Sequence, residues 1–188
     1  MIWIIVIVVL LALVAFGVVG FNKLRATDVG AQEALGGIDV QLTRRADLVP
    51  NLVETVKGYA AHEKGVLEEV TNARARVQEA AKSDDVPAKA AADAQLTGAL
   101  ANINAVAENY PDLKANKNFL ALQEELTGTE SKIAYARQYY NDQVRLLNTA
   151  IQSFPSSVLA SIFHFTAREF FDIEDAARGP VQVTFEGS

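Results

Sequence analysis

The chain has 188 residues, with 17 lysines and arginines against 23 aspartates and glutamates, a formal net charge of −6 and no cysteine. The acidic balance and the lack of a basic stripe argue against a nucleic-acid partner, because nucleic-acid-binding modules cluster lysine and arginine. The missing cysteines exclude disulfides, thiolate metal sites and thiol catalysis.

The chain begins with an apolar run that predicts a membrane anchor. Residues 2–21 carry no charge, and about 20 helical residues span roughly 30 Å, the thickness of the bilayer hydrocarbon. Trp3 and Phe21 lie near the two ends, where interfacial rings are expected. The alternative is a cleaved signal peptide, whose apolar stretch is only about 7–15 residues and follows a basic segment. Lys23 and Arg25 follow the run, so the positive-inside rule predicts an external N-terminus and a cytoplasmic body.

The next segment predicts one long helix over residues 38–81, because apolar residues recur there with alternating spacings of four and three. Pro50 predicts a kink, and the pair Gly36-Gly37 predicts a hinge between the anchor and the body. Arg45 and Glu63 occupy seam positions of this helix. A polar residue at a seam usually sets register or oligomeric state at some cost in stability.

Two more helices are predicted, over residues 88–109 and from residue 116 to residue 154. A shorter helix is expected over residues 157–165, and residues 179–185 are expected to be extended. The fold class is therefore all-α: an N-terminal transmembrane helix, then an up-down bundle of long helices with a short C-terminal helix and an extended tail. The expected domains are a transmembrane anchor (1–22), a long-helix bundle (23–155) and an aromatic-rich short helix with the C-terminal tail (156–188).

Three runs in the body resemble the signature of the LemA family of bacterial membrane-anchored helical proteins. They are IDVQLTRRADLVPNLVETVKGYAAHE (38–63), ENYPDLKANKNFLALQEELTGTE (108–130) and IAYARQYYNDQV (133–144), and Phe154-Pro155 follows them in the same order. The resemblance implies a single-span anchor, a bundle of long helices and a cytoplasmic body. It implies no established catalytic chemistry. It associates the chain with envelope stress and, in magnetosome-forming bacteria, with membrane organelles.

Motifs for chemistry are sparse, so we expect no enzymatic activity, no metal and no cofactor. His62 and His164 are the two histidines of the chain, which is too few for a multi-histidine site within one chain. A zinc-protease motif starting at His62 would need a second histidine at position 66, where the chain has Val66. There is also no glycine-rich phosphate loop and no nucleophile elbow.

Residues 154–171 are rich in phenylalanine. Five of the nine phenylalanines of the chain lie there: Phe154, Phe163, Phe165, Phe170 and Phe171. They cap the open end of the bundle, form a subunit contact or contact the membrane, and the scarcity of basic residues disfavours the membrane contact. We therefore predict a structural or scaffolding protein that is anchored in lipid and self-assembles as a homo-oligomer at the bacterial inner membrane. The alternative is an adaptor or regulator in envelope stress or quality control that binds another membrane protein.

Overall fold

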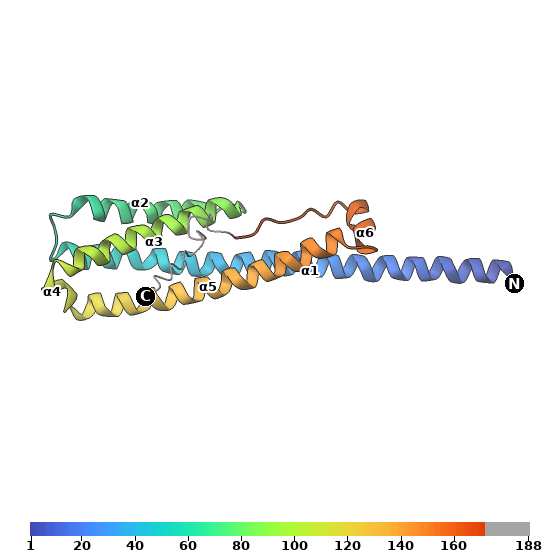
Figure 1. The fold of residues 1–188 in the computed structure, drawn as a ribbon, viewed down its shortest axis with the longest axis horizontal. Helices are drawn as coiled ribbons and strands as arrows, with labels where there is room; N and C mark the ends of the chain where they lie inside the picture. Colours follow the sequence, from blue (N-terminus) through green and yellow to red (C-terminus); the bar gives the residue numbers. More distant parts are fainter. Residues whose placement is uncertain (172–188) are drawn as a thin grey trace, which may run out of the picture.

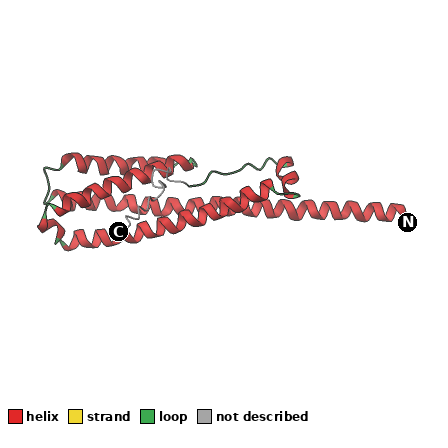
Figure 2. Ribbon diagram, viewed as in Figure 1, coloured by secondary structure: helices red, strands yellow, loops and turns green. Residues whose placement is uncertain are grey.

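The computed structural model describes residues 1–171, which form six helices and no strand (Figure 2). The helices are α1 (Ile2–Lys57), α2 (Lys64–Ala80), α3 (Val86–Glu108), α4 (Pro111–Lys114), α5 (Lys117–Gln152) and α6 (Ser156–Ile162). The predicted all-α fold with a long apolar N-terminal helix is confirmed. The tail predicted at residues 179–185 lies outside the described residues.

Helix α1 organises the molecule, because its first part projects beyond every other helix and its second part enters the bundle (Figure 1). In the projecting part the large apolar side chains from Ile2 to Val14 are all exposed, and the first buried side chain is Leu24. The projecting part is long and apolar enough to cross a membrane. The predicted anchor is therefore a bare helix that continues directly into the bundle.

Helix α5 runs back along α1, and the α2–α3 hairpin packs beside this pair (Figure 1). The core lies where the apolar faces of these four helices meet. Its fully buried members include Ile38, Leu42, Val49, Leu52 and Val56 of α1, Val70 and Val77 of α2, Leu96 and Ile103 of α3, and Ile133, Tyr140 and Val144 of α5.

The single helix predicted over residues 38–81 is wrong, because the chain reverses between α1 and α2. The amide N–H groups of Tyr59 and Ala60 bond to the carbonyl oxygen of Val56 at 3.0 and 2.8 Å, which closes the end of α1. The apolar spacing continues into α2 because both helices turn one face to the same core. Periodicity reports which face is buried, and it does not separate one long helix from two antiparallel ones.

Helix α1 is unbroken at both points where the sequence predicts weakness. Gly36 and Gly37 lie within it and face solvent. Pro50 also lies within it, and because proline lacks an N–H the carbonyl of Ala46 loses its helical donor. Arg74 of α2 supplies a replacement, since its Nε donates to the Ala46 oxygen at 3.1 Å. The hairpin thus compensates the defect that proline creates.

Side-chain caps fix where α3 and α5 begin, close to the predicted starts. The Asp85 carboxylate accepts from the Ala88 N–H at 2.9 Å, and the Asn116 side chain accepts from the Asn118 and Phe119 N–H groups at 2.9 and 3.0 Å. The last helix, α6, is shorter than the predicted span of residues 157–165 and is followed by an irregular segment, residues 163–171.

Candidate functional site

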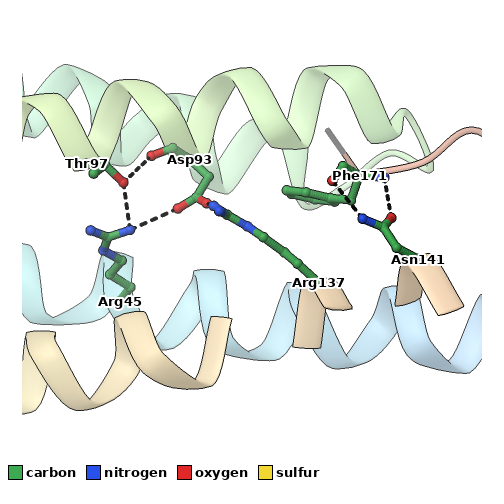
Figure 3. A network of polar contacts seen from close by, with 6 residues as sticks. All are labelled: Arg45, Asp93, Thr97, Arg137, Asn141 and Phe171. Atoms are coloured by element: carbon green, nitrogen blue, oxygen red, sulfur yellow. Dashed lines mark hydrogen bonds and ion pairs between the residues drawn. The ribbon is translucent and has the colours of Figure 1, made fainter. Parts of the chain in front are cut away.

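A buried ion network joins α1, α3 and α5 (Figure 3). Arg45 of α1 donates from Nη1 to Asp93 Oδ1 of α3 at 3.0 Å and to Thr97 Oγ1 at 2.9 Å. The Thr97 hydroxyl in turn donates to the Asp93 carbonyl at 2.9 Å. Arg137 of α5 pairs with the second carboxylate oxygen of Asp93. Asp93 is therefore the hub that connects α1 and α5 through α3.

The network is enclosed by protein. Asp93 is fully buried, and the side chains of Arg45 and Arg137 are 4% and 19% exposed. Burial lowers the pKa of Arg45, and the negative charge of Glu130 partly offsets this shift. Burial, together with the positive charge of Arg45, lowers the pKa of Arg137 to about 10. With a pKa of about 10, the Arg137 guanidinium stays protonated at neutral pH. Two cations share one carboxylate, an arrangement that is costly unless every member keeps its partner.

A second charged pair lies one turn away on α3. Lys89 is fully buried, and its ammonium group pairs with Asp39 of α1, whose side chain is 26% exposed. Lys89 and Asp93 stand four residues apart, so they share one face of α3. In one pair α3 supplies the cation, and in the other it supplies the anion. A shift of α3 along α1 would therefore bring like charges together, so the two pairs fix the register of these helices.

The irregular segment 163–171, which we call the strap, is held against α5 by two asparagines. Asn148 accepts from the Arg168 N–H and donates to the Arg168 carbonyl, both at 2.9 Å. Asn141 accepts from the Phe171 N–H at 2.8 Å and donates to the Phe171 carbonyl at 3.2 Å. Each side-chain amide thus pairs with both backbone groups of one strap residue, as a neighbouring peptide would.

The spacings of these contacts match. Seven residues separate the asparagines on α5, which is about 10.5 Å of helix, and three residues separate Arg168 from Phe171, roughly 10 Å of extended chain.

A tyrosine of α5 adds a third hydrogen bond to the strap. Burial raises the pKa of Tyr140, so its hydroxyl keeps the proton that it donates to the Glu169 carbonyl at 2.8 Å.

The strap ends at the ion network. The Phe171 ring is buried, and the guanidinium of Arg137 lies 5.2 Å from its centroid (Figure 3). A cation over an aromatic face is stabilised by the quadrupole of the ring. Phe171 therefore packs on the network from the strap side.

The strap begins at the membrane end of the bundle, where α6 and the first strap residues pack on α1. The Phe21 ring lies 4.7 Å from the Phe163 ring and 5.9 Å from the Phe165 ring, centroid to centroid. Gly20 makes close packing possible, since a Cβ there would stand 2.4 Å from a methyl carbon of Leu159. We call this contact between α1, α6 and the start of the strap the collar.

The four residues predicted to flank the membrane anchor lie in different surroundings. Of the anchor residues, Trp3 and Lys23 are exposed, Phe21 belongs to the collar, and Arg25 pairs with Asp28 at 2.9 Å. These positions fit a helix that leaves a bilayer near residue 21.

The predicted contact residues divide into three groups. Arg45 and Glu63 both have partners within the chain: Asp93 for Arg45, and for Glu63 the Tyr110 hydroxyl, which donates to it at 3.2 Å. These two polar residues therefore need no neighbouring copy. Phe165 and Phe171 pack within the chain, whereas Phe154 and Phe170 are exposed. Phe163 contacts Phe21 with one side of its ring and is still 51% exposed.

The partners of Arg45 were not predicted from the sequence, although a signal for them was present. The buried stripe of α3 runs through Leu96, Leu100 and Ile103, and its continuation towards the N-terminus by three and four residues falls on Asp93 and Lys89. Charged residues at these seam positions of a second helix indicate buried partners for the arginine on the first. The asparagines that hold the strap gave no comparable signal, because they resemble any polar residues at the edge of a helix.

The site contains no arrangement for acid–base or nucleophilic catalysis, since its carboxylate is neutralised by two arginines. Within residues 1–171 no group of three or more histidine or acidic side chains could hold a metal ion. What the geometry defines is a membrane-associated helical protein whose core is held in register by buried charges.

The chain belongs to the LemA family, whose model matches residues 34–185. It is similar to the magnetosome protein MamQ of Magnetospirillum gryphiswaldense, with 25% identity over 80% of this chain and 64% of the relative. Magnetosome protein MamQ 2 of Paramagnetospirillum magneticum is 24% identical over 90% of this chain and 71% of its own length. Protein LemA of Metamycoplasma hominis is 28% identical, over 74% of this chain and 63% of the relative. The chain thus spans less than two thirds of the length of two of these relatives.

Proposed function

We propose that this protein is a membrane-anchored scaffold that self-assembles at the bacterial inner membrane with its bundle in the cytoplasm. The observation that carries the proposal is the continuity of α1, whose 56 residues form a rod of about 84 Å. One helix supplies both the membrane span and the core of the bundle. The bundle is therefore fixed in height and direction relative to the bilayer, which suits a structural role and is unnecessary for a tethered catalytic domain.

An exposed stripe on α5 offers the contact between copies. Tyr135 and Tyr139 are 73% and 50% exposed, and their spacing of four residues places them on one face of the helix. We call this the α5 stripe.

The anchor explains why a second copy is the occupant we propose. Helix α5 runs along α1 (Figure 1), so the α5 stripe follows the long axis of the rod. Copies anchored in one membrane share direction and depth, so their stripes meet at equal height across a two-fold axis. A symmetric contact of that kind is self-complementary.

The exposed Phe154 and Phe170 are further candidates for contact, whereas Arg45 and Phe171 are enclosed within their own chain. The magnetosome names of two relatives agree with a role at a membrane structure.

The experiment uses the absence of native cysteine. In native membranes a Tyr139→Cys variant should form a disulfide-linked dimer on mild oxidation, because positions near a two-fold axis approach within the roughly 7 Å that a disulfide spans. An Ala75→Cys variant on the exposed face of α2 is the control and should stay monomeric.

Native mass spectrometry of the detergent-extracted wild type should show a homo-oligomer, and a Tyr135→Glu, Tyr139→Glu variant should lower its order. A monomeric mass at all concentrations, together with no cross-link at position 139, would overturn the scaffold. A monomer that is extracted with a different membrane protein would support the adaptor alternative instead.

A further inference from the structure

A cleft lies on the side of the molecule where α1 leaves its apolar segment. It has a volume of about 650 Å³ and is formed by α1, the last turns of α5, the α5–α6 turn and α6. Its lining changes character along α1. Phe16 and Val19 stand at one end, and Lys23 and Thr27 stand at the other.

The polar end gathers groups from two helices. Arg145 and Thr149 of α5 line the cleft together with Lys23 of α1. Lys23 makes no ion pair with any of the described residues, and Arg145 pairs with Asp142 at 2.8 Å in an exposed pair. Exposed pairs of this kind contribute little, so the guanidinium retains donors for another anion.

The dimensions fit an amphiphile that stands upright in the membrane. From Phe16 to Lys23 the helix rises by about 10 Å, which leaves the apolar end of the cleft within the span and the basic end at its boundary. The neighbouring surface is also apolar, because Phe154, Val158 and Ile162 are 84%, 51% and 61% exposed. The cleft therefore opens at the depth where phospholipid head groups lie.

We propose that this cleft binds one acidic phospholipid from the surrounding bilayer. The phosphate lies between Lys23 and Arg145, hydroxyl groups such as that of Thr149 bond to the head group, and the upper part of one acyl chain lies along Phe16 and Val19. A second copy of the chain is a poor occupant, because at equal membrane depth it would bring another Lys23 and Arg145 towards the same charges. An acidic lipid matches both the charge and the depth.

The test titrates phosphatidylglycerol into the full-length protein in a neutral detergent and counts bound lipid by native mass spectrometry. A variant with Lys23→Gln and Arg145→Gln should bind the lipid about 25-fold more weakly, since a basic residue near an acidic lipid contributes roughly fivefold. The matched control carries Arg25→Gln and Lys132→Gln, which remove the same charge from exposed positions outside the cleft. The control should bind within about twofold of wild type.

Two further arms separate a specific site from general attraction. Thr149→Phe keeps all charges and fills the cleft, so it should abolish lipid binding while the circular dichroism spectrum stays helical. Glycerol phosphate, which has no acyl chain, should not displace the lipid. The proposal is overturned if the control variant loses as much affinity as the cleft variant, if Thr149→Phe binds normally, or if glycerol phosphate displaces the lipid at equal concentration.

Discussion

Replacing Asp93 should be the most destabilising single change in the bundle. Asp93→Ala removes the only carboxylate that Arg45 and Arg137 share among the described residues. Arg45 is then left with Thr97 alone, at a site where its side chain is only 4% exposed. Arg137 is partly exposed and keeps its contact with Phe171, so most of the cost comes from Arg45.

Breaking a buried ion pair on one side costs about 3–5 kcal/mol. A domain of this size is stable by about 5–15 kcal/mol, so the variant should lose roughly a fifth of its stability or more. Single changes to Arg45→Met or Arg137→Met should cost less, because Asp93 keeps one cation in each case. The triple variant Arg45→Met, Asp93→Leu, Arg137→Met should regain most of the loss, since it leaves no uncompensated charge.

The assay is urea unfolding of the full-length protein in a mild detergent, followed by the helical circular dichroism signal. The midpoint and slope give the free energy of unfolding for each variant. A loss below about 1 kcal/mol for Asp93→Ala, or a triple variant less stable than Asp93→Ala, would refute the view that the charges depend on one another.

Three more predictions concern the strap, the glycine pair and the topology. Asn148→Ala should speed hydrogen exchange at the Arg168 amide at least about fivefold, since losing two partly buried hydrogen bonds costs about 1–3 kcal/mol. Gln138→Ala on the exposed face of α5 should leave that exchange rate unchanged, and equal exchange in both variants would argue against the strap contact. Gly36→Ala and Gly37→Ala should each raise the free energy of unfolding by about 0.5–1 kcal/mol, because a Cβ at either position meets no atom within 4 Å; a decrease would show that α1 needs a hinge there. Protease added to intact spheroplasts should leave the body uncut, because we expect it in the cytoplasm. Digestion of the body while a cytoplasmic control protein survives would contradict this orientation.

The sequence predicts much of the fold because helix formation leaves a local record. The uncharged run before Lys23 identifies the anchor, and the alternating spacings of three and four identify the buried faces of α1, α3 and α5. The reversal after Lys57 could not be derived in the same way, because it is stabilised by what α2 packs against. The same applies to the hinge expected at Gly36-Gly37, since packing against α5 outweighs the weak helix propensity of two glycines.

The candidate site was less predictable than the fold for a physical reason. Arg45 stands out in the sequence because a charge interrupts an apolar seam, but its partner lies 48 residues away and its neighbour Arg137 lies on a third helix. A seam position shows that a charge is buried without showing what neutralises it. Because Arg45 has its partners within the chain, it fixes the register of the helices and needs no neighbouring copy.

The strap gives the buried network a physical connection to the membrane end of the bundle. Phe165 contacts Phe21, Arg168 bonds to Asp28 at 2.9 Å from Nε, and Phe171 packs against Arg137. Every third strap residue thus faces the helices. Three residues of extended chain match the seven helical residues that separate Phe21 from Asp28, as they match the seven that separate the two asparagines of α5.

A shift of the collar by one strap residue would therefore misplace both asparagine contacts and remove Phe171 from the network. The strap fits only one register of α1 against α5. Since α1 is also the proposed membrane span, the position of that span in the bilayer and the packing around Asp93 would be linked through one segment with a fixed register. This linkage gives the buried charges a structural role. Together with the strap, they allow only one register of the bundle helices relative to α1.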